Sequence, residues 1–240
     1  MSIRVQSACL ILLMFLASGV RAEELRYLSA DALNAVELLP TPATIDSEEA
    51  RAERDLMVTL QRQRTEGQVA RCRSEVKVTL AAFARVMGPW FTAENLPRLA
   101  QLLKHAEKDV VVFSGVAKTH FARKRPAAED PRIQIAVENE DSPSYPSGHA
   151  TRGIVFATII AQLAPQQQAA LLERGREIGW DRVIAGMHHP SDIIAGRVVG
   201  QAVARALLAN PQFQEDLAAA RTEFESVQKQ KLRAEPAQVR

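Results

Sequence analysis

Residues 190–204 read PSDIIAGRVVGQAVA, and this stretch decides the fold class. Proline is favoured at the first position of a helix, where its missing N–H is not needed. Apolar residues then recur at helical spacing, and we expect them to face inward: Ile193, Ile194, Val198, Val199 and Val203. Gly196, Gly200 and Ala204 are small residues four apart, so they share one helix face and let a neighbouring helix approach closely. The stretch therefore predicts a buried, closely packed helix.

The segment before residue 90 carries further helix signals. Asp46 and Ser47 can cap a helix whose first turn is acidic. Gly67 is expected to divide the helical region in two, and Gly88-Pro89 to end it. Helical spacing is carried by Leu56, Leu60, Val69, Val76 and Leu80.

The remaining segments also favour helix. Thr92 opens a helix expected to continue to Lys124; within it, 110–116 would suit a strand by propensity, but its neighbours are strong helix formers and no partner strand is evident. One face of this helix carries Leu96, Leu99, Leu102 and Leu103. Further helices are expected over 148–163, 165–186 and 211–228. We predict an all-α, single-domain helical bundle over 47–228.

The two ends differ from this domain. Residues 1–22 combine Arg4, a short apolar run and small residues before Glu23, the pattern of a cleaved secretory signal peptide; an uncleaved membrane anchor is the alternative. Residues 23–46 are expected to form an extended arm, and 229–240 a charged, disordered tail. No later run is apolar for some eighteen residues, so we expect a periplasmic or secreted protein with no stable membrane insertion after cleavage.

Charge balance argues against a nucleic-acid partner, and the cysteine count argues against an internal disulfide. The chain has 30 Lys and Arg against 28 Asp and Glu, and two of the basic residues lie in the signal, which leaves the rest formally neutral. This balance argues against nucleic acid as a partner. Cys9 lies in the signal, so Cys72 has no internal partner and is expected to be a structural thiol.

Three short clusters carry candidate chemistry: Lys118-x6-Arg125-Pro126, Pro146-Ser147-Gly148-His149, and Arg182-x5-His188-x3-Asp192. Each alone is ordinary, since basic residues near helix ends are usually solvated and Ser-Gly before a helix is usually a cap. An acid-rich loop, 127–145, lies between the first two clusters.

Together the clusters suit a phosphate group. A phosphoryl group in transfer spreads negative charge over three oxygens, and catalysis is mostly positioning and electrostatic stabilisation. Arg125 and Arg182 can each hold two oxygens, and Lys118 adds a compact charge. Ser147 and Gly148 stand where free N–H groups leave a helix N-terminus, which is a natural anion site.

The two histidines suit two roles. His188 is the better nucleophile, because Asp192 can hold the proton of one ring nitrogen and leave a lone pair on the other. His149 is then expected to protonate the leaving oxygen and later activate water.

The clusters resemble the signature of the type 2 phosphatidic acid phosphatase (PAP2) superfamily: K-x6-RP, then PSGH, then SR-x5-H-x3-D. The chain looks most like its secreted class A nonspecific acid phosphatases, also through Ser144-Tyr145 and 195–200. The resemblance implies a metal-independent acid phosphatase without cofactor, a phosphohistidine on His188, a small phosphorylated substrate and a homo-oligomer. It also implies phosphate binding by Lys118, Arg125, Ser147, Gly148 and Arg182, with His149 as the acid and Asp192 as the orienter.

Two departures and two alternatives stay open. Asp181 replaces the usual Ser before Arg182; it would weaken anion binding, point away, or hold Arg182 in a salt bridge. His189 stands where relatives often carry Trp. A lipid or isoprenoid-pyrophosphate phosphatase at the membrane surface is one alternative function. A vanadate-dependent haloperoxidase, which uses the same anion cradle, is the other, although such proteins are usually far larger.

Overall fold

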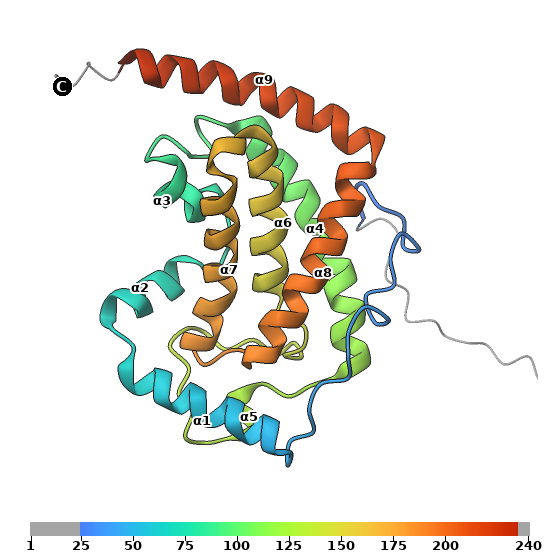
Figure 1. Cartoon of the computed structure of the whole chain (residues 1–240), viewed down its shortest axis with the longest axis vertical. Helices are drawn as coiled ribbons and strands as arrows, with labels where there is room; N and C mark the ends of the chain where they lie inside the picture. The colour runs from blue at the N-terminus through green and yellow to red at the C-terminus, as the bar shows by residue number, and fades with distance from the viewer. Residues whose placement is uncertain (1–24, 235–240) are drawn as a thin grey trace, which may run out of the picture.

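Helices form the whole regular framework of the described chain. The computed structural model describes residues 25–234 (Figure 1). Its longer helices are α1 (Glu48–Gln63), α2 (Glu66–Ser74), α4 (Pro97–Phe121), α6 (Gly148–Leu163), α7 (Gln168–Ile184), α8 (Pro190–Ala209) and α9 (Pro211–Ala234). Its short ones are α3 (Ala84–Met87), α5 (Pro126–Glu129) and two 3-10 turns, Leu80–Phe83 and Pro165–Gln167. The described residues contain no strand, so the prediction of an all-α fold is confirmed.

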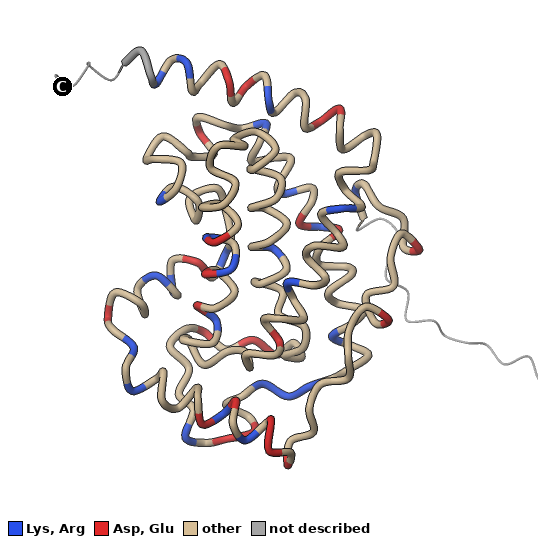
Figure 2. Tube along the Cα trace, in the orientation of Figure 1, with Lys and Arg blue, Asp and Glu red and all other residues tan. Residues whose placement is uncertain are grey.

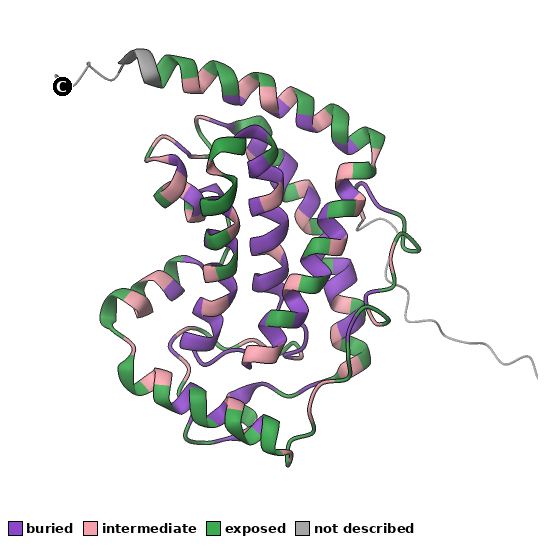
Figure 3. Ribbon diagram, in the orientation of Figure 1, coloured by how far each residue is buried: buried purple, intermediate pink, exposed green. Residues whose placement is uncertain are grey.

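Helix α6 is the centre of the bundle. Helices α4, α7 and α8 pack around it, while α9 crosses one end, α1 and α5 lie at the other, and α2 lies beside α7 (Figure 1). Figure 3 shows α6 buried along most of its length, which fits its nearly unbroken apolar sequence. Its contact with α7 is backbone-close, because a Cβ on Gly153 would lie 2.4 Å from the Gly175 carbonyl oxygen.

Several helix starts lie where the sequence placed them. The Ser47 and Ser147 hydroxyls accept hydrogen bonds from Ala50 N at 3.1 Å and Ala150 N at 3.4 Å, and so cap α1 and α6. Pro190 and Pro211 are the first residues of α8 and α9.

The region before α4 differs from the prediction. The break between α1 and α2 falls at 64–65 and not at Gly67, because Thr65 caps α2 by accepting from Gln68 N at 3.2 Å. Helix α2 ends at Ser74, so Val76 and Leu80 lie outside it. Local capping therefore outweighed the apolar periodicity over this stretch.

Helix α4 begins later and ends earlier than expected. It starts at Pro97 after the N-cap Leu96, and it includes the ambiguous run 110–116 as helix. It ends at Phe121 and not at Lys124, because Ala122 takes a left-handed conformation with φ 46° that reverses the chain.

Two residues of α8 predicted to face inward are exposed instead. Ile194 is 61% exposed and Val198 37%, whereas Ile193, Val199 and Val203 are buried. A rotation of about 100° per residue puts residues 194 and 198 on the side of the helix away from the buried set.

The chain ends frame the bundle. Residues 25–46 form an irregular arm along it: Tyr27 N donates to Asp109 of α4 at 3.1 Å, and Tyr145 donates its hydroxyl to the Pro40 carbonyl at 2.8 Å. The expected signal, 1–22, lies outside the described residues. Helix α9 continues to Ala234, past Gln228, so the first part of the expected disordered tail is helical.

Charge and hydropathy of the described part are unexceptional. Figure 2 shows acidic and basic residues interspersed along the trace, with neither sign confined to one face. Among the described helices, none combines the length and apolar character needed to cross a membrane.

Candidate active site

The candidate residues meet at the end of the bundle opposite α9. The last turn of α4 supplies Lys118 and the last turn of α7 supplies Arg182. The first turn of α6 supplies His149, and the α7–α8 junction supplies His188. Ser147 N donates to the Asp192 carbonyl at 2.9 Å, so the starts of α6 and α8 are bonded directly. Segments about 70 residues apart in sequence thus form one site.

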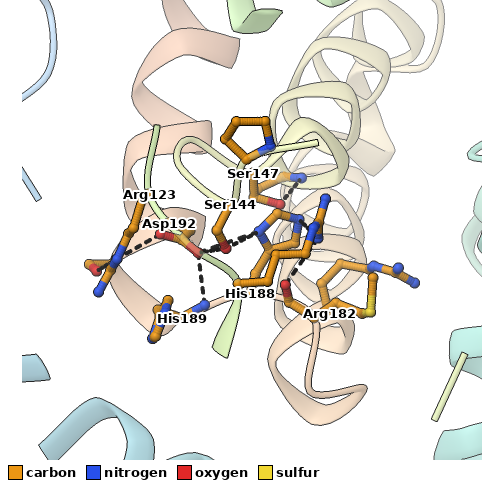
Figure 4. Close-up of polar contacts among 12 residues, drawn as sticks. Arg123, Ser144, Ser147, Arg182, His188, His189 and Asp192 are labelled. Carbon is orange, nitrogen blue, oxygen red and sulfur yellow. Dashed lines mark hydrogen bonds and ion pairs between the residues drawn. The ribbon is translucent and has the colours of Figure 1, made fainter. Parts of the chain in front are cut away.

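His188 is enclosed and held on both ring nitrogens (Figure 4). Its Nδ1 lies 3.4 Å from Asp192 Oδ2 and 3.2 Å from Ser144 Oγ, while its Nε2 lies 3.4 Å from Arg125 Nη1. Burial lowers the pKa of His188 to about 4, although Asp192 acts to raise it. The imidazole is therefore neutral at pH 7. A proton on Nδ1, facing Asp192, leaves the lone pair on Nε2, where Arg125 Nη1 lies.

Asp192 belongs to a buried network that the sequence did not reveal. Ser144 donates its hydroxyl to Asp192 Oδ2 at 2.5 Å, and Arg123 Nη1 donates to Oδ1 at 2.7 Å. Arg123 also pairs with Glu53 of α1 at 2.8 Å. Burial opposes ionisation of Asp192, but His188 and Arg123 outweigh it and hold the pKa of this carboxyl far below its usual range. In the sequence, only its position before the second cluster marked Ser144 as a candidate for the site, and nothing marked Arg123.

Two of the predicted cations, Arg125 and Arg182, contact one acidic side chain, Glu140. Arg125 Nη2 donates to Glu140 Oε2 at 2.7 Å, and Arg182 Nη2 lies 3.5 Å from Glu140 Oε1. Arg182 is almost fully buried, and its Nε and Nη1 have no hydrogen-bond partner among the described residues. Burial, with the charge of Arg125, lowers the pKa of Lys118 to about 8.

His149 lies in the first turn of α6, next to Gly148 and the cap residue Ser147. Its Nε2 is 3.1 Å from the Val76 carbonyl. Burial, followed by the positive charge of Arg182, holds the pKa of His149 well below its ordinary value. The structure thus places all eight predicted site residues at this end of the bundle, with His149 in its neutral form.

The two departures from the family pattern both turn away from the site. Asp181 forms a bidentate pair with Arg71 of α2, at 2.7 Å to Nε and 2.6 Å to Nη2, so it neither contacts nor holds Arg182. Cys72 donates to the Asp181 carbonyl at 3.2 Å and is fully buried, as a structural thiol would be. The His189 ring points away from His188 and lies 3.4 Å from Glu129 (Figure 4).

Open space adjoins the site. A cavity of about 480 Å³ is lined by Arg125, Glu140, Asp141 and Met187, among others. Within residues 25–234, no group of three or more His, Cys, Asp or Glu side chains is arranged to hold a metal ion.

Comparison with known families finds a match over the part of the chain that holds the candidate site. Residues 109–216 match the model of the PAP2 superfamily, and this span contains every candidate site residue. Residues 109–216 of this all-α bundle thus resemble the PAP2 superfamily, the same family that the motifs resemble.

Curated relatives carry phosphatase names. The chain is 33% identical over 153 residues to a non-specific acid phosphatase of Providencia stuartii, covering 62% of each chain. It is 35% identical over 150 residues to an acid phosphatase of Zymomonas mobilis, covering 61% of this chain and 57% of the relative. A shorter match, 40% over 57 residues, covers 24% of this chain and 25% of a lipid A 1-phosphatase of Rhizobium etli. The matches thus span about three fifths of the acid phosphatases' own length.

Proposed function

We propose that this protein hydrolyses phosphate monoesters through a phosphohistidine on His188. The observation that carries the proposal is the neutral His188 ring, held by Asp192 and faced by buried cations. The acid phosphatase names of the relatives support the same reaction class.

The first half of the proposed reaction forms a P–N bond. His188 Nε2 attacks phosphorus while the ester P–O bond breaks, and the leaving oxygen takes a proton from His149. Asp192 keeps the proton of Nδ1 in place as charge develops on the ring. Asp192 is suited to this because its own ionised form is stabilised by Arg123.

The second half returns the enzyme to its starting state. His149, now neutral, takes a proton from water, and the resulting hydroxide attacks phosphorus as the P–N bond breaks. Arg125, Arg182 and Lys118 offset the charge on the three phosphoryl oxygens in both halves. The Gly148 N–H at the start of α6 is a further donor. Ser147 N is already bonded to the Asp192 carbonyl, so Ser147 would contribute its hydroxyl.

The decisive experiment replaces the nucleophile and its neighbour in parallel. His188→Ala should lower turnover of p-nitrophenyl phosphate by at least about a thousandfold, because the proposed intermediate forms on this ring. His189→Gln is the matched control, since this adjacent ring faces Glu129, and it should retain most of the activity. Circular dichroism checks that both variants fold.

The intermediate itself can be observed. Rapid quenching of the wild-type reaction in alkaline detergent should trap phosphate on His188, because a phosphoramidate survives base and not acid. Phosphate found on another residue, or undiminished turnover by His188→Ala, would remove the basis of the assignment.

A lipid phosphate is the second candidate substrate. The supporting observation is the 57-residue match to a lipid A 1-phosphatase. Turnover of a detergent-solubilised lipid phosphate, measured beside soluble esters, separates the two. We favour the soluble ester because the longer matches carry the acid phosphatase name.

We also propose export, on the signal-like sequence of residues 1–22. N-terminal sequencing of the protein from the periplasm or medium should begin at Glu23. An intact N-terminus retained in the membrane would support the anchored alternative.

A further inference from the structure

We propose that residues 140–143 are an internal ligand of the phosphate cradle, the group of cations formed by Lys118, Arg125 and Arg182. The Glu140 carboxylate then occupies the position where a substrate phosphate would bind. This inference rests on the proposed function, because phosphate is the ligand that would displace the segment. It makes Glu140 a specificity-determining residue that competes with the substrate inside the same chain.

All three cations contact oxygens of this segment, Arg125 and Lys118 by hydrogen bonds and Arg182 as an ion pair. Arg125 donates to Glu140 Oε2 at 2.7 Å and to the Ser142 carbonyl at 2.9 Å. Arg182 lies 3.5 Å from the other Glu140 oxygen, and Lys118 donates to the Pro143 carbonyl. Oxygen acceptors on a negatively charged group are what a phosphate would offer the same three side chains.

The cradle is not saturated by this segment. Arg182 Nε and Nη1, both buried, have no partner among the described residues, although a guanidinium has five N–H donors. A carboxylate has two oxygens and a phosphate monoester three that do not bear the ester group. A phosphate can therefore satisfy donors that Glu140 leaves unpaired, and this difference favours exchange of the two anions.

The segment is fixed at its two ends. Ala136 N donates to the Ala185 carbonyl at 3.0 Å, and Ser144 N donates to the Arg123 carbonyl at 2.8 Å. Between these anchors, residues 137–143 make no backbone–backbone hydrogen bond to any other described residue. The segment can therefore leave the cradle without breaking a helix or a ladder.

Glu140 has space to move into and remains negatively charged. The Glu140 side chain is 37% exposed and borders the cavity of about 480 Å³, so it can turn outward. Burial opposes its ionisation, but Arg125, Arg182, His188 and Lys118 lower the pKa of Glu140 and keep it charged. Asp141, the next residue, is exposed and makes no ion pair with the three cations in the described structure.

A competing internal anion lowers apparent affinity by the fraction of molecules in which the cradle is free. Glu140→Gln keeps the size of the side chain and removes its charge, so it should strengthen binding of inorganic phosphate by about tenfold. Asp141→Asn removes the same charge from the neighbouring position and should change the affinity by less than about twofold. Calorimetric titration of the full chain with inorganic phosphate measures all three proteins.

The outcomes are distinct. Tighter binding by Glu140→Gln alone supports the proposal. If Glu140→Gln binds phosphate with unchanged or lower affinity, or not at all, the proposal is overturned. It is also overturned if Glu140→Gln and Asp141→Asn increase the affinity equally. Weaker binding would mean that Glu140 orients Arg125 and Arg182 for the substrate.

Turnover of p-nitrophenyl phosphate, measured separately, isolates the proposed function. If Glu140→Gln tightens phosphate binding but the wild type hydrolyses no ester, the phosphatase assignment fails and the internal ligand stands. If the wild type hydrolyses the ester and Glu140→Gln binds phosphate with unchanged affinity, only the internal-ligand proposal is refuted.

Discussion

The two histidines of the candidate site have pKa values shifted in the same direction. Burial lowers both, that of His188 to about 4 and that of His149 well below its ordinary value. A neutral His188 is what a nucleophile needs. His149 must carry a proton to act as an acid, and burial beside Arg182 disfavours that proton. A bound phosphate adds negative charge next to His149 and raises its pKa again.

This pair of shifts predicts the pH dependence of the rate. The profile of kcat/KM reports the free enzyme, so its rising limb should lie near pH 4, where His188 loses its proton. Its falling limb, where His149 loses its proton, should be displaced to lower pH than an ordinary histidine would give. The falling limb of kcat, which reports the bound complex, should lie at higher pH. Steady-state kinetics from pH 3 to 9 measure both limbs; coincident falling limbs or an alkaline optimum would contradict the role of His149.

Asp181 tests whether a departure from the family pattern costs function. Because it faces Arg71 and not Arg182, Asp181→Ser should leave KM for p-nitrophenyl phosphate within about twofold of wild type. It should lower the free energy of unfolding by about 2 kcal/mol, through loss of two charged hydrogen bonds. Urea unfolding and kinetics on one sample measure both; a clearly lower KM would mean that Asp181 weakens the anion site.

At the scale of elements, the site depends on how closely three helices approach. A Cβ on Gly196 of α8 would lie 2.5 Å from the Ser147 carbonyl at the start of α6, nearer than real atoms pack. A Cβ on Gly153 of α6 would meet the backbone of α7 at a similar distance. Glycine at these crossings therefore sets the separation between the helix ends that carry Ser147, Arg182 and His188.

Gly196→Ala should disturb both folding and the site. Overpacking against backbone costs about 1–3 kcal/mol, and the start of α6 must move away from α8. Gly115→Ala on α4 is the control, since its Cβ has nothing within 4 Å, and it should stabilise the protein by up to about 1 kcal/mol. Thermal unfolding and steady-state kinetics measure both variants. If Gly196→Ala and Gly115→Ala have the same melting temperature and the same kcat/KM, this role of Gly196 is refuted.

At the scale of the whole molecule, buried polar groups link distant parts of the chain. Tyr27 of the N-terminal arm donates its hydroxyl to Asp216 of α9 at 2.7 Å and its N–H to Asp109 of α4. At the other end, Arg123 links α1 to α8 through Glu53 and Asp192. Unfolding releases these groups together, so their ionisation makes stability depend on pH.

Stability should fall as the solution is acidified. His188 and His189 have folded pKa values of about 4 against 6.5 unfolded, so the unfolded chain binds more protons between these limits. His188 alone should remove about 2 kcal/mol between pH 7 and pH 5. Asp109 and Glu129, whose pKa values burial raises, act in the opposite direction at the acidic end.

Urea unfolding at pH 7 and pH 5 measures this loss. His188→Gln, which cannot take up a proton, should show a smaller difference between the two pH values than wild type. Equal stability at both pH values in the wild type would contradict the lowered histidine pKa values.

Much of the framework could be predicted because its causes are local. Ser147 caps α6 and Pro190 starts α8 through contacts within a few residues, and the leucines of 96–103 bury one face by spacing alone. Predictions failed where two local signals competed. The break predicted at Gly67 lies at 64–65, because Thr65 caps α2. The helix predicted to reach Lys124 ends before it, because Ala122 has a left-handed backbone conformation.

The sequence by itself determined the helices and the chemical types of the cations, the two histidines and the acid of the candidate site, because spacing and side-chain chemistry are written along the chain. Only the tertiary structure decided what each of them contacts. Asp181 faces Arg71, Arg123 and Ser144 hold Asp192, and Glu140 meets Arg125 and Arg182. Most of these partners lie tens of residues apart, and no spacing rule encodes which of several nearby charges a buried side chain will find when the helices pack.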